Sequence, residues 1–345
     1  MASNPFDPET HLRFFAEFCK YVRLAGGATP HLVMVWGAAR NQPPVERLWR
    51  GGCYAATYNF PAAEAIWRSW GPDTVRSAGV LPIVDWLREH WKAIPLRKER
   101  KAVRTPEKLS ECLVSLAKWM KDALEHAAFN PECPINPRER YEMAWEDFGQ
   151  VKYMGRYITI RFLEFMHRAF DIPLIMPDIR PVGGEFPRQS LNLMFPQSEW
   201  ALLGGNSHVE LAEVNRVADE AITRLRDEYG VVIDHYTLQS LLCEYKQSVL
   251  GQRQYPGRSV DSELGYWRKV YGGENGFAAL ADSTEFWKVR RELFPWQVLG
   301  EDARNQWAGA RDDLGKVLVN FNYTWSDALF DYTASKERLA DPVRR

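Results

Sequence analysis

Side chains suited to binding phosphate are concentrated between residues 148 and 188, which read FGQVKYMGRYITIRFLEFMHRAFDIPLIMPDIRPVGGEFPR. The pattern predicts a helix, a short turn that ends at Gly155, and a second helix that begins at Arg156. Backbone amides at the start of a helix have no partner within it, and the helix dipole adds partial positive charge there. This corner, with Lys152 and Arg156 beside it, is therefore a candidate site for a DNA phosphate. Helix–turn–helix connections also occur without any ligand, so the turn alone is weak evidence.

A single carboxylate, Asp178, lies 23 residues beyond Gly155 in the sequence Pro177-Asp178-Ile179-Arg180-Pro181. Because proline restricts the backbone, we expect this carboxylate to be held rigidly. Two interpretations stay open. Asp178 caps a helix or pairs with Arg180, or it acts as a general base or electrostatic stabiliser, which requires partial burial to raise its pKa.

A run of basic residues lies between residues 97 and 108, where six Lys and Arg against two Glu give +6 − 2 = +4. The whole chain has 44 Lys and Arg against 45 Asp and Glu, a net charge of −1. Any binding to nucleic acid must therefore use a local basic face. A solvated linker is the commoner meaning of such a run. The alternative is contact with a DNA backbone, with Lys98 and Lys101 as the candidate side chains.

The other reactive side chains have simple interpretations. Glu244 lies on an expected helix whose apolar positions face a core, so a surface role for Glu244 and Lys246 is favoured. The alternative is that Glu244 orients a substrate amine or an arginine. The seven histidines form no zinc-hydrolase pattern, and no glycine pair is followed by the G-K-[ST] of a phosphate loop. The five cysteines contain no C-x-x-C pair, which favours reduced, mostly buried thiols over a metal site.

Hydrophobic spacing predicts helices along most of the chain, and therefore an all-α fold. A glycine pair, Gly51-Gly52, lies inside one expected helix and favours the close approach of another backbone. A stretch rich in proline and glycine, 171–206, interrupts the helices, and irregular segments of that length are often functional. Short strands are candidates only at 172–176 and 231–233. The expected helices span residues 7–24, 45–58, 60–70, 74–92, 106–128, 138–151, 156–170, 207–229 and 234–250, with a looser helical set from 260 to 338.

Length and composition exclude several classes of protein. The chain has 345 residues, of which 46% are hydrophobic and 26% charged, values unlike those of disordered or collagen-like chains. No stretch approaches the roughly 18 to 20 consecutive apolar residues of a membrane helix, and the first residues do not resemble a signal peptide. We therefore expect an intracellular, cytoplasmic protein that does not contact a membrane. Aromatic residues make up 13% of the chain, which suits a Trp-rich helical core or a surface that stacks bases.

Residues 151–159, VKYMGRYIT, resemble the helix-hairpin-helix of the DNA glycosylase superfamily, usually written L-P-G-V-G-x-x-T-A. In that superfamily an essential aspartate follows the hairpin after a turn that contains proline or valine, and Asp178 matches this place. Residues 53–67 resemble the helix, turn and helix that precede the hairpin there. Two positions depart from the pattern. Tyr153 replaces the first hairpin glycine, and Tyr157 replaces the lysine of the bifunctional enzymes, so the resemblance does not support a Schiff-base mechanism.

The whole chain looks more like a bacteriophage branch of that superfamily, the amino acid:DNA transferases and the related α-glutamyl/putrescinyl thymine pyrophosphorylases. The residues that carry this resemblance are the Trp/Tyr-rich opening, 155–157, 177–181 with Gly183-Gly184, and 242–246. The resemblance implies a transferase. Pyrophosphorylated 5-hydroxymethyluracil in DNA loses pyrophosphate and gains an amino acid or other amine on its methylene carbon.

The implied partners are double-stranded DNA that carries this activated base, and an amino acid or polyamine. No cofactor is implied, with Mg²⁺ on the pyrophosphate as an option, and a phage-encoded enzyme would act in the host cytoplasm. Two alternatives stay open: a DNA glycosylase that excises a modified base, and a DNA-binding protein without catalytic activity.

The resemblance also implies an organisation and a set of site residues. A glycosylase-like domain is expected over 1–205, with the hairpin at 148–160 and a catalytic loop at 171–190, followed by a helical C-terminal domain over 206–345. The base must leave the helical stack for an aromatic-lined pocket. Arginines suit the departing pyrophosphate, and a carboxylate suits the proton of the attacking amine. The expected catalytic residues are Asp178, Arg180 and Arg156; the expected substrate-binding residues are Tyr58, Asn59, Tyr157, Lys152, Arg188 and Glu244; the expected DNA-binding residues are Gly155, Tyr153, Lys98 and Lys101.

Overall fold

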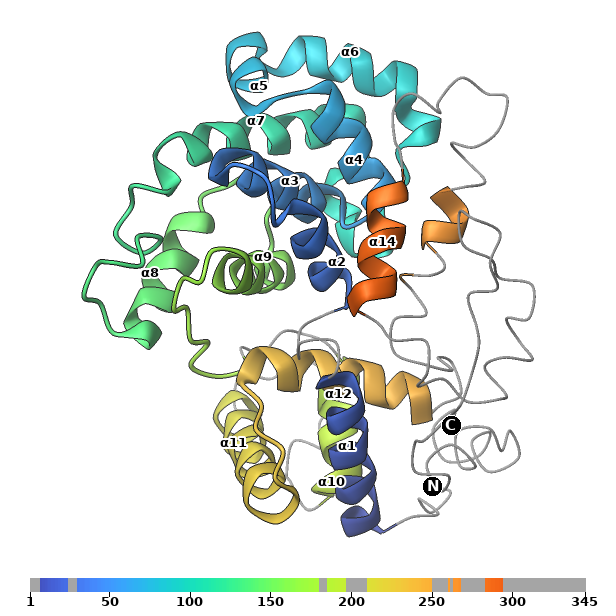
Figure 1. Cartoon of the computed structure of the whole chain (residues 1–345), viewed down its shortest axis with the longest axis vertical. Helices are drawn as coiled ribbons and strands as arrows, with labels where there is room; N and C mark the ends of the chain where they lie inside the picture. Colours follow the sequence, from blue (N-terminus) through green and yellow to red (C-terminus); the bar gives the residue numbers. More distant parts are fainter. Residues whose placement is uncertain are drawn as a thin grey trace. The chain divides into compact units, whose positions relative to one another are not determined.

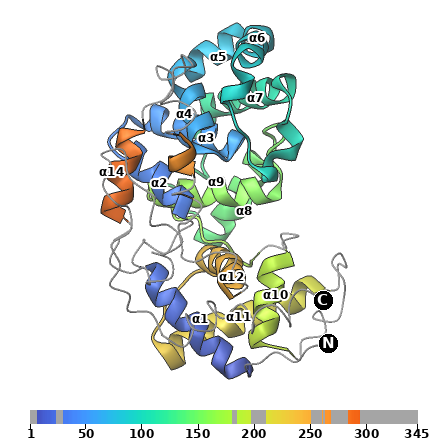
Figure 2. The ribbon, with the colours of Figure 1, turned by 90° about the vertical axis from the view of Figure 1, so that its right-hand side faces the viewer.

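The structure is a computed structural model of the chain, and it describes residues 7–23, 30–179, 185–196, 210–249, 260, 263–267 and 283–293. Within these ranges every regular element is a helix, which confirms the all-α fold class. Figures 1 and 2 show the helices from two directions. The structural similarity of this fold to the helix-hairpin-helix DNA glycosylases stays a prediction.

The helices are short to medium in length and follow one another closely along the chain. In chain order they are α1 (Pro8–Arg23), α2 (Pro30–Ala39), α3 (Pro44–Thr57), α4 (Phe60–Ser69), α5 (Pro72–Ala78), α6 (Val80–His90), the 3₁₀ helices η1 (Trp91–Ala93) and η2 (Lys98–Val103), α7 (Pro106–Ala123), α8 (Pro137–Phe148), α9 (Arg156–Ala169), α10 (Glu185–Met194), α11 (Glu210–Tyr229), α12 (His235–Val249) and α14 (Thr284–Leu293).

Proline and capping side chains explain where many of these helices begin. Proline is the first or second residue of α3, α4, α5, α7 and α8, where its missing N–H costs nothing. Asn59, Thr105 and Asn136 accept backbone N–H bonds at the starts of α4, α7 and α8. These local signals account for the agreement between the predicted and observed starts of these helices.

The chain divides into two compact units, each assembled from separated segments. Unit 1 comprises Met1–Pro30, Met176–Ser259 and Arg291–Arg345, and unit 2 comprises His31–Ile175 and Val260–Arg290. A segment near the C-terminus therefore folds with the first half of the chain. The predicted boundary between 205 and 206 lies within unit 1 and outside the described residues, so the domain assignment stays a prediction.

Helix α3 is the centre of unit 2, and two glycines set how closely its neighbours pack. It contacts α4, α7 and α9, as Figure 1 shows. A Cβ atom added to Gly51 would lie 2.1 Å from Cε1 of Phe165 in α9. One added to Gly52 would lie 2.6 Å from Cδ2 of Leu116 in α7. The close approach expected at this pair is confirmed, but the neighbours are side chains rather than backbone.

A buried arginine joins α3 to three other elements of unit 2. Arg50 donates from Nε to Glu64 of α4 at 2.6 Å and from Nη2 to Glu285 of α14 at 2.9 Å. Its Nη1 donates to the carbonyl oxygen of Ala38 in α2 at 2.7 Å. Burial raises the pKa of Glu64, and Arg50 opposes that rise. Such a network orients helices well, although desolvation of the charges offsets much of the attraction.

Four helices, α1, α10, α11 and α12, form the described part of unit 1, and each contacts the other three (Figure 2). His11 of α1 is completely buried, and its Nδ1 lies 2.9 Å from the hydroxyl of Tyr245 in α12. The rings of Phe15 and Phe18 pack against Tyr245 with centroids 5.2 and 5.8 Å away. Because the imidazole is buried among these rings, its pKa is lowered to about 4.

Several local predictions are wrong for identifiable reasons. The expected helix over 74–92 is two helices, because Gly79 adopts φ 73° and ends α5. The expected irregular stretch over 171–206 contains α10, which tolerates Pro187 in its first turn. Residues 172–176 and 231–233 are irregular rather than strands. Helix α2 escapes detection because its sequence is apolar on most sides and lacks the period of an amphipathic helix.

We expect Gly51→Ala to lower the free energy of unfolding by about 1–3 kcal/mol, the usual cost of overpacking a filled core. The reason is the contact that the added methyl group would make with Phe165. Gly265→Ala is the matched control, because a Cβ there meets nothing within 4 Å. Urea unfolding followed by circular dichroism measures both. Equal stability of the two variants would contradict the proposed role of Gly51.

Stability should also depend on the protonation of His11. The folded-state pKa of about 4 lies below the ordinary value of 6.5, so the unfolded chain binds the proton more tightly. This contribution is therefore complete above pH 6.5 and is lost as the pH falls to 4, by about 3 kcal/mol in total. Urea unfolding at several pH values measures it. His11→Gln should reduce the dependence over this window, whereas His235→Gln, which removes a histidine paired with exposed Asp219, should retain it.

Candidate functional site

The corner between α3 and α4 presents Tyr58 and Asn59, two of the expected substrate-binding residues. Tyr58 ends α3 in the left-handed conformation, with φ 53° and ψ 32°, and is only 3% exposed. Asn59 caps α4, since its side-chain oxygen accepts the N–H of Ala62 at 3.1 Å. The carboxamide oxygen of Asn59 is thus committed to helix capping, which leaves its amide group for any ligand.

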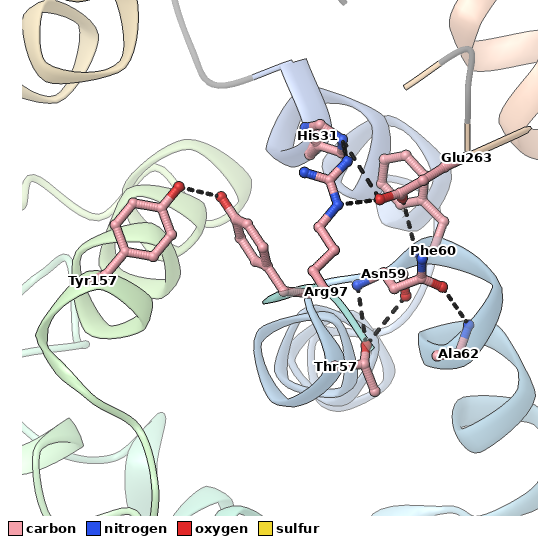
Figure 3. A network of polar contacts seen from close by, with 9 residues as sticks. His31, Thr57, Asn59, Phe60, Ala62, Arg97, Tyr157 and Glu263 are labelled. Atoms are coloured by element: carbon pink, nitrogen blue, oxygen red, sulfur yellow. Dashed lines mark hydrogen bonds and ion pairs between the residues drawn. The ribbon is translucent and has the colours of Figure 1, made fainter. Parts of the chain in front are cut away.

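A partly buried ion pair lies beside this corner (Figure 3). Arg97 donates from Nε to Glu263 and from Nη2 to Nε2 of His31. The backbone N–H of Phe60, at the start of α4, donates to the other oxygen of Glu263 at 3.3 Å. Because arginine only donates, Nε2 of His31 accepts, and the ring proton of His31 lies on Nδ1. Burial lowers the pKa of Arg97, but Glu263 together with Tyr54 and Tyr58 outweighs this effect, so the pKa of Arg97 is raised.

Aromatic rings enclose this charged group. The guanidinium carbon of Arg97 lies 5.7 Å from the centre of the Tyr58 ring. His31 stacks on Phe60 with ring centroids 5.2 Å apart, and Tyr54 stacks on the same phenyl ring at 5.3 Å. Rings lower the local dielectric and so strengthen the Arg97–Glu263 interaction.

A pair of tyrosine hydroxyls connects this corner to the first turn of α9. The hydroxyl oxygens of Tyr58 and Tyr157 are 2.7 Å apart, and their rings pack edge to face with centroids 5.6 Å apart (Figure 3). Two residues predicted to bind substrate, far apart in sequence, are therefore in direct contact. Burial, together with the neighbouring Tyr157 and Tyr54, raises the pKa of Tyr58 well above its ordinary value. Tyr58 consequently keeps its proton at neutral pH.

The turn before α9 has the form that the sequence predicts. Helix α8 ends at Phe148, and α9 begins at Arg156 with Gly155 as an N-cap that has no side-chain hydrogen bond. Gly155 and Arg156 are exposed, and a Cβ added to Gly155 meets nothing within 4 Å. Tyr153, which stands where the glycosylase pattern has glycine, adopts φ 62°. The amides of the first turn of α9 thus lack a capping side chain.

Lys152 and Tyr153, which precede this turn's glycine, both contact one carboxylate. The Tyr153 hydroxyl donates to Glu111 of α7 at 3.1 Å, and Nζ of Lys152 lies 3.5 Å from the same oxygen. Lys152 is exposed. The structure therefore brings these residues together at the surface, and their roles in binding substrate and DNA stay predictions.

The basic run over 97–108 is not a solvated linker. It contains η2, and two of its arginines are used inside unit 2: Arg97 in the ion pair described above, and Arg100, which is 2% exposed. Arg100 donates to the carbonyl oxygens of Ala56 and Tyr153 at 2.8 and 3.0 Å. Lys101 remains exposed, whereas the side chain of Lys98 lies outside the described residues. DNA binding by either lysine stays a prediction.

The remaining expected site residues belong to unit 1. Asp178 is half-buried in a bend, and Arg188 is half-buried on α10. Arg180 lies outside the described residues. Glu244 on α12 is only 8% exposed, so the surface role favoured for it is wrong, because its helix is enclosed by the neighbouring helices of unit 1. Lys246 lies outside the residues whose side chains are described.

Sequence reasoning missed His31 and Glu263 altogether. Glu263 lies more than 160 positions beyond its partner Arg97, and His31 lies in the unpredicted helix α2. No local pattern marks either residue, since both gain their importance from contacts with Arg97.

The described residues were also compared with the requirements of a metal site, a reactive thiol and a membrane-spanning helix. Among the described side chains, no three His, Cys, Asp or Glu residues are grouped to hold a metal ion, so a role for Mg²⁺ stays a prediction. Of the five free cysteines, three are buried and two half-buried, consistent with the expected thiols. None of the described helices combines the length and apolar character that crossing a membrane requires.

Comparison with known proteins identifies the family. Residues 55–254 match the model of a family described as amino acid:DNA transferase, and this span is more than half of the chain. The chain belongs to the amino acid:DNA transferase family, whose description implies transfer of an amino acid to DNA, a form of DNA modification. Neither the curated proteins nor the solved structures contain a match. Tyr58, Tyr157 and Asp178 lie within the matched span, whereas His31 and Glu263 lie outside it.

We expect Glu263→Ala to lower the free energy of unfolding by about 3 kcal/mol, because it leaves the mostly buried charge of Arg97 without its carboxylate partner. Glu285→Ala is the matched control from the same segment. Its carboxylate pairs with Arg50 but is 48% exposed, and Arg50 retains Glu64, so a loss of about 1 kcal/mol or less is expected. Urea unfolding measures both variants. A smaller loss for Glu263→Ala than for Glu285→Ala would refute the importance of the buried pair.

Proposed function

We propose that this protein replaces the pyrophosphate of pyrophosphorylated 5-hydroxymethyluracil in DNA with an amino acid or another amine. The family match is the observation that carries the proposal, because it implies DNA and an amino acid as substrates. The activated base is the finer part of the proposal. A carbon that is to accept an amine needs a good leaving group, and pyrophosphate on the methylene oxygen supplies one.

The proposed reaction is a substitution at the methylene carbon. The bond from this carbon to the pyrophosphate oxygen breaks, and a bond to the amine nitrogen forms. Pyrophosphate leaves with the electron pair of the broken bond, and the amine gives one proton to a base. The enzyme must therefore stabilise an anion and accept a proton.

Residues of this chain are assigned to these tasks as follows. Arg156, exposed at the start of α9, and Arg180 stabilise the departing pyrophosphate by bidentate bonds. Asp178, which is half-buried, accepts the amine proton. Tyr58 and Tyr157 are the aromatic residues beside the everted base. Gly155, Tyr153, Lys98 and Lys101 contact the DNA backbone. Arg188 and Lys152 support the binding of pyrophosphate, and Glu244 orients the amine substrate.

Product analysis tests the proposed function. Duplex DNA that contains pyrophosphorylated hydroxymethyluracil is incubated with amino acids and Mg²⁺, with and without chelator, and the DNA is digested for nucleoside mass spectrometry. The expected result is release of pyrophosphate together with a nucleoside whose mass is that of hydroxymethyldeoxyuridine plus the amine minus one water. Free base with abasic sites would instead identify a glycosylase, and binding without any product would identify a DNA-binding protein.

Replacement of Asp178 separates catalysis from binding. Asp178→Asn should lower turnover at least about 100-fold, because general base catalysis supplies 10²–10⁴-fold, while DNA affinity stays within about twofold. Asp85→Asn is the matched control, since Asp85 is exposed and pairs only with Arg88 among the described residues. Single-turnover product formation and filter binding measure the two effects. Full activity of Asp178→Asn would remove this residue from the mechanism.

A further inference from the structure

The hydrogen bond between Tyr58 and Tyr157 has a direction that can be assigned from burial. Neither tyrosine hydroxyl makes another hydrogen bond to a described residue. Tyr58 is 3% exposed, whereas Tyr157 is half-buried. If Tyr157 were the donor, the O–H of Tyr58 would be buried without an acceptor among the described residues, at a cost of about 1–3 kcal/mol. Tyr58 is therefore the donor and Tyr157 the acceptor.

This direction leaves the O–H of Tyr157 available. A phenol that accepts one hydrogen bond still has its own proton to donate, and acceptance polarises that O–H, which makes it a better donor. Tyr157, the half-buried member of the pair, can therefore donate its own hydroxyl proton to a ligand.

The charges around Tyr157 favour an anionic acceptor. Tyr157 is the second residue of α9, whose first-turn amides lack a capping side chain, and the exposed Arg156 precedes it. The guanidinium carbon of Arg161 lies 5.2 Å from the centre of the Tyr157 ring. Glu164 offsets part of this charge, because it pairs with Arg161 at 2.8 Å on the side of α9 that is buried. The helix start and Arg156 remain as the positive groups nearest the surface.

The left-handed backbone conformation of Tyr58 indicates that contacts of its side chain hold it in place. A left-handed residue other than glycine costs about 1–2 kcal/mol, and glycine commonly ends helices in this conformation. Here tyrosine holds the position with φ 53°. Strain of this kind persists where surrounding contacts over-determine the conformation. The contacts of Tyr58 include Arg97 and Tyr54 at its ring and Tyr157 at its hydroxyl.

We propose that the Tyr157 hydroxyl donates a hydrogen bond to a phosphoryl oxygen of the substrate DNA, and that Tyr58 is a positioning residue that holds and polarises this hydroxyl. The phosphoryl oxygen belongs either to the pyrophosphate that leaves the base or to the DNA backbone. The inference rests on the proposed function for the identity of the substrate, but its geometry is that of unit 2 alone. The Arg97–Glu263 pair then acts indirectly, because it fixes the ring of Tyr58.

A double-mutant cycle tests the proposal with the full chain and two probes, inorganic pyrophosphate and an unmodified DNA duplex. Tyr157→Phe should weaken binding of one probe by about 10- to 100-fold, the effect of a lost hydrogen bond to a charged acceptor. Tyr58→Phe should weaken binding of the same probe by about threefold. In the Tyr157→Phe background, Tyr58→Phe should have no further effect, because it acts only through the Tyr157 hydroxyl.

The probe that loses affinity identifies the source of the phosphoryl oxygen. Weaker binding of pyrophosphate identifies the leaving group, and weaker binding of the duplex identifies the backbone. Tyr266→Phe, at an exposed tyrosine outside this pair, is the control and should bind both probes as the unaltered protein does. Thermal unfolding verifies that each variant is folded.

Three results would overturn the proposal: no binding of either probe by the unaltered protein, unchanged binding by Tyr157→Phe, or equal effects of Tyr58→Phe in both backgrounds. The product assay described above is separate. The double-mutant cycle could behave as expected although the protein forms no aminated nucleoside. That result would support the phosphoryl contact and refute the proposed reaction. If the protein forms the aminated nucleoside but the substitutions at Tyr157 and Tyr58 do not change binding, the reaction is supported and the phosphoryl contact is refuted.

Discussion

The close packing of α3 is the constraint on which the rest of unit 2 depends. The glycine pair in its middle admits Phe165 from one side and Leu116 from the other, which fixes the distances of α9 and α7 from α3. Tyr58 ends the same helix, so its position relative to α9 follows from this packing. The 2.7 Å contact between Tyr58 and Tyr157 is thus a consequence of core geometry about two helical turns away.

Ion pairs that involve buried or partly buried arginines are a second constraint on the fold of unit 2. Two arginines, Arg50 and Arg97, each pair with a glutamate from the segment 260–290, namely Glu285 and Glu263, although Arg50 also pairs with the buried Glu64. This segment lies beyond the residues that match the family model. A buried arginine without its carboxylate is costly, so the segment is an integral part of the fold of unit 2 rather than an accessory. It also shapes the candidate site, because Glu263 fixes the guanidinium that lies over Tyr58.

The candidate site combines two features that DNA-modifying chemistry requires. The start of α9 offers backbone amides and an exposed arginine, which suit an anion. The adjoining α3–α4 corner offers stacked rings and satisfied buried polar groups, which hold their geometry without reorganisation. The family description is consistent with the first feature, since an enzyme that transfers an amino acid to DNA must bind a molecule that carries phosphate charge.

Local sequence signals determined much of this protein: the helical class, the starts of α3, α4, α7 and α8, the turn before α9, and the special nature of Gly51-Gly52. These features depend on residues close together in the chain, such as an initial proline, a capping side chain or the period of apolar positions.

Only the tertiary structure decided which polar residues meet. It withdrew Arg97 and Arg100 from the expected basic linker, buried Glu244, and joined Arg97 to Glu263 and His31. The physical reason is that the pairing of a buried charge is set by which segments pack together. The sequence around Arg97 does not indicate a partner that lies more than 160 residues away. The start of a helix, in contrast, is determined by about four consecutive residues.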